Sequence, residues 1–137
     1  MKTENLAAKW PSHGPELLSL LRITASIMFM LAGSTKLFAF PSGIPPNGGT
    51  VELLSQLGVG AVMEVFGGGM LLIGLWTRPV AFLLSGEMAV AYFQFHFPHG
   101  LWPVMNGGVP AVLYCFLWLY FSAAGPGPWS LDAKLPK

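Results

Sequence analysis

The chain has 137 residues, of which 53% are hydrophobic and 9% are charged, and its formal net charge is +1. Soluble domains carry about a quarter charged residues, so these charges are too few to cover a water-facing surface. The abundance of aliphatic and aromatic side chains excludes a disordered chain, and the lack of a Lys/Arg cluster excludes a nucleic-acid-binding protein. The composition therefore predicts an integral membrane protein in contact with the lipid bilayer.

Four apolar runs follow one another along the chain, each near the length of about 20 residues that a membrane crossing needs. They cover residues 16–40, 51–76, 79–97 and 106–124. A polar segment, residues 1–15, precedes them, and a tail, residues 125–137, follows them. The connections between the runs are short, which predicts a single domain with an all-α fold: a membrane-spanning four-helix bundle.

Positive charges predict the orientation of this bundle. Lys2 and Lys9 precede the first run, Arg78 lies between the second and third runs, and Lys134 and Lys137 follow the fourth. The other two connections contain no Lys or Arg. Because Lys and Arg concentrate in cytoplasmic loops, the N- and C-termini are both predicted to be cytoplasmic.

Ionisable residues lie inside the apolar runs. Arg22 and Lys36 belong to the first run, Glu64 to the second and Glu87 to the third. Each such group costs about 2.5–3.5 kcal/mol near the bilayer centre, so four unpaired groups would cost on the order of 10 kcal/mol. The acids and bases are therefore interpreted as partners, or as protonated acids in hydrogen-bond networks. One such pairing joins Arg22 to Glu64, whose simultaneous replacement by Leu should be tolerated while either replacement alone destabilises.

Helical periodicity places these groups toward the bundle interior. At about 100° per residue, one face of the first helix forms a polar stripe; its members are Arg22, Ser26, Phe29, Gly33 and Lys36. Gly60 and Gly68 flank Glu64 at intervals of four, a spacing that lets helices approach closely. Glu87 and Gln94 share a face of the third helix. Three polar faces predict a polar lining inside the bundle.

Three interpretations of this lining remain open: ion pairs that only fix helix register, a cavity that binds a small polar headgroup or relays protons, and an interface with other subunits. Other candidate sites are weaker. His96 and His99 have no further ligand nearby in the sequence, so no metal site is predicted. Tyr114 and Trp118, one turn apart, could stack on a quinone ring or simply pack in the core. The single cysteine, Cys115, excludes an intramolecular dithiol.

Four segments resemble the DoxX family of small bacterial four-helix membrane proteins, and the resemblance extends from Leu17 to Ala133. They are LLRITASIMFMLAGSTKLFAF, MEVFGGGMLLIGLWTRPVA, GEMAVAYFQFHFPHGLWPVMNGG and AVLYCFLWLYFSAAGPGPWSLDA. The family pattern continues the Asn-Gly-Gly with an acidic residue, whereas this chain has Val109 there. If that acidic residue binds a proton or cation at the outer end of the bundle, this chain lacks it.

The resemblance implies a location in the bacterial cytoplasmic (inner) membrane. It also implies a role as an accessory subunit, of the kind associated with terminal quinol oxidation and thiosulfate:quinone oxidoreduction. Carried over to this sequence, it implies a polar core that includes His96 and Asn106. Together with the helical faces, this gives a predicted ligand-binding or polar core of seven residues: Arg22, Lys36, Glu64, Glu87, Gln94, His96 and Asn106.

Three functions are compatible with these features. The first is a subunit or partner of a quinone-linked redox complex, in which Arg22 or Lys36 donates to a quinone headgroup and Glu87 accepts a proton. The second is a small proton-coupled transporter, although no inverted repeat is visible. The third is a structural accessory subunit. The sequence predicts no intrinsic cofactor beyond a possible quinone, and a non-catalytic subunit rather than a stand-alone enzyme.

Overall fold

The computed structural model describes residues 9–136, so the first eight residues of the predicted N-terminal segment, with Lys2, and the terminal Lys137 lie outside the described part. The elements in chain order are η1 (Trp10–His13), α2 (Gly14–Phe38), α3 (Gln56–Ile73), α4 (Thr77–Ala91), η2 (Tyr92–His96), η3 (Phe97–His99), α5 (Pro103–Asn106) and α6 (Val109–Ala124). Within these residues the only β-type pairing is an isolated bridge in the loop after α2. The predicted all-α fold is confirmed.

Three helical stretches are long and apolar enough to cross a membrane, and α6 is a shorter apolar helix. They are Trp10–Phe38, Gln56–Ile73 and Thr77–His99. The 16 residues of α6 rise only about 24 Å, less than a hydrocarbon core of about 30 Å. The predicted fourth run was expected from residue 106, but α6 begins at Val109 because Asn106 ends the short helix α5 and Gly107 follows with φ 73°. The chain is an all-helical membrane bundle.

Helix ends differ from the predicted runs where capping chemistry intervenes. The second run was predicted from residue 51, but α3 begins at Gln56 because the Ser55 hydroxyl accepts a hydrogen bond from the Gly58 N–H at 3.0 Å. The helix ends before Gly74, whose φ of 69° is left-handed and suits glycine. The third run extends past residue 97, because a π-helical turn (η2) and a 3-10 turn (η3) prolong α4.

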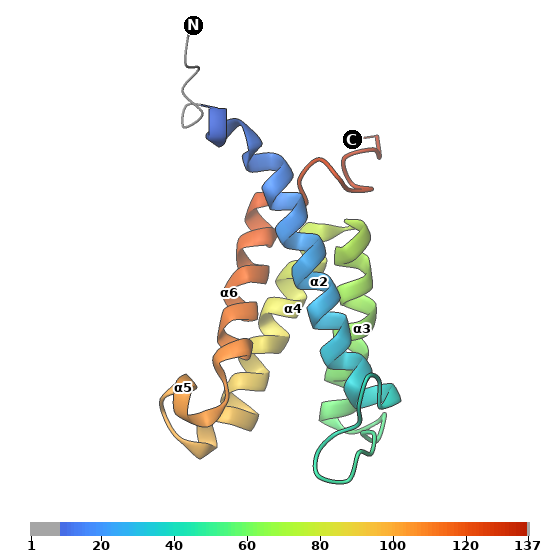
Figure 1. Ribbon diagram of the computed structural model, residues 1–137, viewed down its shortest axis with the longest axis vertical. Helices are drawn as coiled ribbons and strands as arrows, with labels where there is room; N and C mark the ends of the chain where they lie inside the picture. The colour runs from blue at the N-terminus through green and yellow to red at the C-terminus, as the bar shows by residue number, and fades with distance from the viewer. Residues whose placement is uncertain (1–8, 137) are drawn as a thin grey trace, which may run out of the picture.

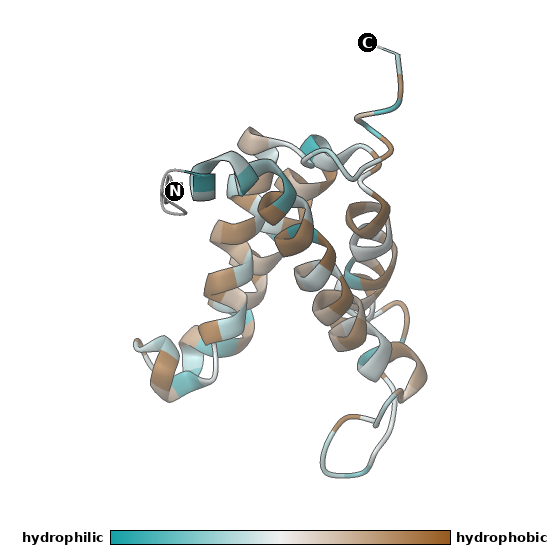
Figure 2. Ribbon diagram, turned by 45° about the horizontal axis from the view of Figure 1, so that its top comes forward, coloured by the Kyte–Doolittle hydropathy of each residue, from teal (hydrophilic) through white to brown (hydrophobic). Residues whose placement is uncertain are grey.

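The helices form two pairs that we call hairpins: α2 with α3, and α4 with α6. Contacts within each hairpin are extensive, whereas α3 touches α4 over a smaller area. Figure 1 shows the hairpins joined at the end with the α3–α4 turn and splayed at the end with α5. Hydrophobic residues occupy much of each helix in Figure 2, and large ones such as Phe66, Phe82 and Phe116 are exposed. These surfaces are suited to contact with lipid.

An aromatic cluster joins the two hairpins at mid-height. The Phe29 ring of α2 lies 5.0 Å from Tyr114 and 5.5 Å from Trp118, both on α6 (centroid distances). Tyr114 and Trp118 stack on one another at 5.7 Å, and Trp118 is completely buried with Phe121. Of the two predicted uses of Tyr114 and Trp118, the structure shows core packing.

Gly33 allows α2 and α3 to approach closely. A Cβ added there would lie 2.8 Å from the Ala61 carbonyl oxygen and 2.9 Å from the Glu64 Cβ. Because backbone cannot yield as a side chain can, we expect Gly33→Ala to destabilise the protein by about 1–3 kcal/mol. Gly86→Ala on α4 is the matched control, since its Cβ would meet no atom within 4 Å. Equal unfolding free energies for the two variants in mixed micelles would contradict this close approach.

The residues after α6 form a strap rather than a free tail; we call residues 125–136 the C-terminal strap. Its Leu131 N–H donates to the Ile73 carbonyl at 3.0 Å. The Asp132 carboxylate accepts the N–H groups of Trp76 and Thr77, both at 2.8 Å. The strap thereby caps the N-terminus of α4, where a negative charge is favourable.

Asp132 makes this cap sensitive to acid. Burial of Asp132 opposes its charge, but hydrogen bonds from Thr77 and Trp76 and the charge of Arg22 outweigh burial and hold its pKa below the ordinary value. The stability it contributes is full above the unfolded-state pKa of about 3.9 and is lost as pH falls through the lower folded-state pKa. We therefore expect Asp132→Asn to reduce the acid dependence of the melting temperature. Parallel melting curves from neutral to strongly acidic pH would show no difference if the cap contributes nothing.

Candidate functional site

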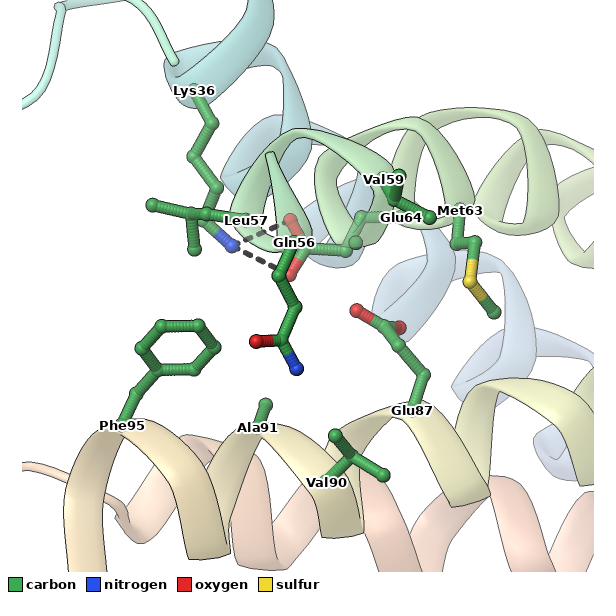
Figure 3. A pocket seen from close by; sticks show the side chains of 11 residues that line it. Lys36, Gln56, Leu57, Val59, Met63, Glu64, Glu87, Val90, Ala91 and Phe95 are labelled. Atoms are coloured by element: carbon green, nitrogen blue, oxygen red, sulfur yellow. Dashed lines mark hydrogen bonds and ion pairs between the residues drawn. The ribbon is translucent and has the colours of Figure 1, made fainter. Parts of the chain in front are cut away.

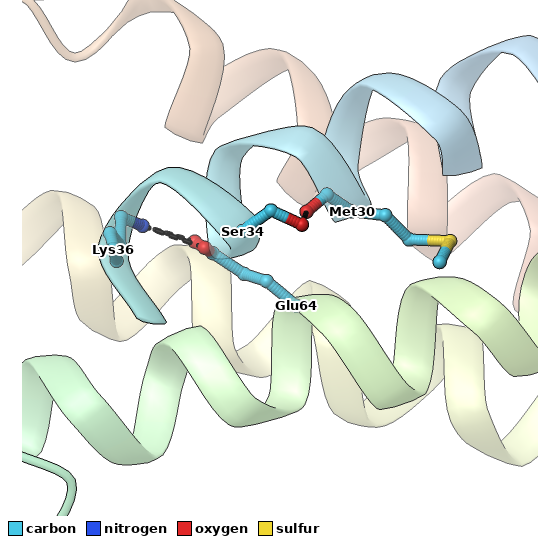
Figure 4. Close-up of polar contacts among 4 residues, drawn as sticks. All are labelled: Met30, Ser34, Lys36 and Glu64. Carbon is cyan, nitrogen blue, oxygen red and sulfur yellow. Dashed lines mark hydrogen bonds and ion pairs between the residues drawn. The ribbon is translucent and has the colours of Figure 1, made fainter. Parts of the chain in front are cut away.

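An ion pair joins the end of α2 to the middle of α3. The Lys36 ammonium lies 2.6 Å from Glu64 Oε1 and 2.7 Å from Oε2, as Figure 4 shows. The Glu64 side chain is only 5% exposed, whereas that of Lys36 is 26% exposed. The neighbouring Ser34 hydroxyl donates to the Met30 carbonyl at 2.9 Å within its own helix. Glu64 is thus paired with Lys36, not with Arg22 as the sequence suggested.

Beside this ion pair lies a cavity of about 260 Å³ between α2, α3 and α4. Figure 3 shows side chains of both hairpins around it. Its lining consists of Lys36, Gln56, Leu57, Val59, Gly60, Met63, Glu64, Glu87, Val90, Ala91 and Phe95. Most of these side chains are apolar, and the two valines are also exposed on the outer surface. The cavity therefore borders both the ion pair and the lipid-facing seam between α3 and α4.

Within residues 9–136, Glu87 is the carboxyl group of this cavity that has an oxygen without a hydrogen-bond partner. Its Oε2 atom is buried and has no hydrogen-bond partner among the described residues. Gly60 makes room for it, since a Cβ on Gly60 would lie 3.1 Å from Glu87 Oε1. The carboxyl group in Figure 3 points from α4 toward α3, near Met63. A carboxyl group without a partner in an apolar cavity favours a ligand or a proton as its counterpart.

Two glutamines meet at the splayed end of the cavity. The Gln56 side-chain amide on α3 donates to the Gln94 side-chain oxygen on η2. Gln94 was predicted by helical phase to share a face with Glu87, and the π-helical turn Tyr92–His96 carries it. Gln56 was not predicted, because nothing in an isolated Gln near a helix start indicates what lies opposite.

The DoxX family model matches residues 17–97. The chain belongs to the DoxX family. The match includes every residue of the ion pair and the cavity and ends before Asn106, so it is shorter than the resemblance from Leu17 to Ala133.

Two relatives of this DoxX protein are similar over nearly their whole length. An uncharacterized protein of Haemophilus influenzae is 41% identical over 128 residues, which cover 91% of this chain and 95% of the relative. An uncharacterized membrane protein of Mycobacterium tuberculosis is 26% identical over 158 residues, which cover 98% and 93%. No solved structure matches the chain.

Arg22 lies away from the cavity of this DoxX protein, at the end where the hairpins join. The side chain is completely buried. Its guanidinium donates to the carbonyl oxygens of Pro126, Trp129 (2.6 Å) and Leu72 (3.5 Å), and Ser19 accepts the Trp129 N–H at 3.1 Å. Arg22 therefore holds the C-terminal strap and does not join the polar lining.

His96 and Asn106 also lie outside the cavity, at the corner between η2 and α5. His96 Nδ1 lies 3.2 Å from the Asn106 carbonyl oxygen. The Asn106 side chain donates to the Gly100 carbonyl at 2.7 Å and accepts the Gly108 N–H at 2.8 Å. These bonds shape the loop before α6. Within residues 9–136 no three His, Cys, Asp or Glu side chains are grouped as metal ligands.

Val109 begins α6. It lines a second, apolar cavity of about 310 Å³ together with Ala25 and Tyr114. The structure thus brings together Lys36, Glu64, Glu87 and Gln94 of the seven predicted residues, and separates Arg22, His96 and Asn106 from them.

Proposed function

We propose that this DoxX-family protein binds a quinone or quinol headgroup in the cavity beside Glu87, as a subunit or partner of a quinone-linked redox complex. The observation that carries this proposal is a buried, unpartnered carboxyl oxygen in an otherwise apolar cavity. The Lys36–Glu64 pair beside it is already satisfied, so Glu87 is the group available to a ligand.

Size and access favour such a ligand. Small-molecule pockets commonly measure about 300–1,000 Å³, so a cavity of about 260 Å³ suits a single ring rather than a whole lipid-soluble quinone. Val59 and Val90 line the cavity and are exposed on the bundle surface, where lipid would lie. A ring can therefore occupy the cavity while its chain remains in the bilayer.

The chain's own residues supply complementary polar contacts. When deprotonated, Glu87 accepts a hydrogen bond from a hydroxyl, and when protonated it donates to a carbonyl. The Lys36 ammonium has three N–H groups, and its two contacts with Glu64 leave a third for the cavity. A bound quinone would supply the electron-transfer chemistry, while these side chains would hold the ring and exchange its proton.

Location and orientation complete the proposal. We place the protein in the bacterial inner membrane with the start of α2 and the C-terminal strap on the cytoplasmic side. The strap reaches Arg22 and Ser19 of α2, so both ends of the described chain lie at one end of the bundle. Arg78 and Lys134 belong to the same end, in agreement with the concentration of positive charge in cytoplasmic segments.

Substitution of Glu87 tests the proposal. We expect Glu87→Gln to weaken binding of a short-chain quinol analogue by about tenfold or more, as loss of a charged hydrogen bond does. Titration of the purified protein in nanodiscs measures this affinity. Glu52→Gln is the matched control, because Glu52 is exposed in the loop before α3 and does not line the cavity.

Unchanged affinity in Glu87→Gln, or no binding by the native protein, would contradict a quinone site at Glu87. Proton-driven flux of a solute in proteoliposomes, abolished by the same substitution, would favour the transporter function instead. Native affinity in a double variant lacking the Lys36–Glu64 pair would show that this pair serves only the fold.

A further inference from the structure

The two hairpins have few polar contacts with one another at their splayed end. Among residues 9–136, the hydrogen bond between Gln56 and Gln94 is the one polar contact that joins a helix of one hairpin to a helix of the other. It spans from the first residue of α3 to the π-helical turn. At the opposite end the strap and the α3–α4 turn hold the hairpins together. A change in hairpin separation would therefore be largest at the two glutamines.

These glutamines also stand between water and the cavity. Gln56 lines the cavity, and both side chains are exposed. They lie at the end of the bundle where α2 ends and α3 begins, next to the loop of residues 39–55. Figure 3 shows the Lys36–Glu64 pair beside Gln56, and Glu87 farther along the cavity toward Met63. Lys36, which is 26% exposed, is the other polar lining residue near this end, but its ammonium is bound to Glu64.

We propose that the Gln56–Gln94 hydrogen bond is a gate, which closes the water-facing mouth of the cavity and admits water and protons to Glu87 when it breaks. A neutral hydrogen bond exposed to water contributes little net free energy, so it breaks and re-forms readily. The lipid-facing seam at Val59 and Val90 is a separate entrance. The cavity thus has a polar entrance for water and an apolar entrance for a lipid-soluble ligand. The role of the gate in proton delivery rests on the proposed function, whereas the access of water to Glu87 does not.

Carbodiimide labelling of Glu87 distinguishes the two entrances. The full-length protein in nanodiscs is treated with a water-soluble carbodiimide or with dicyclohexylcarbodiimide, which enters from lipid, and the stable acylurea on Glu87 is measured by mass spectrometry. We expect Gln56→Ala and Gln94→Ala each to raise the rate with the water-soluble reagent by about fivefold, the change in open population that the loss of one net hydrogen bond produces. The rate with the lipid-soluble reagent should stay the same.

Two further variants complete the experiment. Thr35→Ala is the control, because Thr35 lies at the same end of the bundle but bonds only to the Phe40 carbonyl of its own connection. Gln56→Glu combined with Gln94→Lys should restore slow labelling by joining the hairpins with an ion pair. Circular dichroism and gel filtration verify the fold of each variant.

If Gln56→Ala and Gln94→Ala both leave the labelling rate with the water-soluble reagent unchanged, the gate is overturned. An equal rise in rate with both reagents would also overturn it, because that result indicates general loosening of the bundle. Slow labelling of Glu87 in Gln56→Ala and Gln94→Ala but fast labelling in Thr35→Ala would also overturn it. Quinone binding does not enter this measurement, so failure of the gate and failure of the quinone site are separate outcomes.

Discussion

Replacing Lys36 with Met is expected to destabilise the protein by about 3–5 kcal/mol, because it leaves the carboxylate of Glu64 buried without its partner. Glu64→Met should cost less. Lys36 stands near the end of α2 and is 26% exposed, so its ammonium can turn toward water once Glu64 is gone. The double variant should be nearly as stable as the native protein, since two apolar side chains replace a desolvated ion pair. Unfolding in mixed micelles, followed by circular dichroism, measures the four free energies.

The coupling free energy between the Lys36 and Glu64 substitutions shows whether the two side chains act as an ion pair or independently. A double variant more stable than Lys36→Met alone shows that the cost comes from an unpaired buried charge. Additive losses would show that each side chain contributes independently, against the bidentate pair at 2.6 and 2.7 Å. The Arg22/Glu64 double replacement suggested by the sequence should bring no such rescue, because the two residues have different partners.

Replacing Arg22 with Met should release the C-terminal strap. The carbonyl oxygens of Pro126, Trp129 and Leu72 lose a shared donor, and each bond to a charged group is worth about 1.5–3 kcal/mol. We expect a loss of stability on the order of 3 kcal/mol and rapid proteolysis within residues 125–136. Arg22→Lys should rescue only in part, because an ammonium lacks the planar fork that reaches several carbonyls.

Arg78→Met is the matched control for this experiment. Arg78 also donates to carbonyl oxygens, those of Ser122 and Ala123 at the end of α6, but its side chain is exposed. Water replaces its hydrogen bonds at little cost, so the strap should remain protected. Equal proteolysis rates in Arg22→Met and Arg78→Met would contradict a specific role of Arg22 in holding the strap.

The distinction between Arg22 and Lys36 shows what periodicity conveys. Both residues lie on the polar face of α2 that the sequence predicted, and both turn inward. Their 14-residue separation corresponds to about 21 Å along the helix, however, so they meet different neighbours. Periodicity predicts the direction in which a side chain points, but not which residue of another helix lies opposite.

The C-terminal strap and the glutamine contact show a second limit. Asp132 caps a helix 55 residues earlier in the chain, and Gln56 meets a residue 38 positions later. Neither contact has a local signal such as a capping box or a turn motif. Gln94 reaches Gln56 from a π-helical turn, which a regular 3.6-residue repeat does not predict.

Composition and hydropathy by themselves determined that this protein is an all-helical membrane bundle, because a chain so poor in charge lies in lipid, and continuous apolar runs near 20 residues long satisfy their backbone there as helices. The residues LLRITASIMFMLAGSTKLFAF and their neighbours also determined the family. Only the tertiary structure decided that Lys36 neutralises Glu64, that Glu87 is left without a partner, and that Arg22 holds the strap. Those outcomes depend on helix depth, on the close approach at Gly33 and on contacts between distant segments, and the arrangement of residues along a single helix contains none of them.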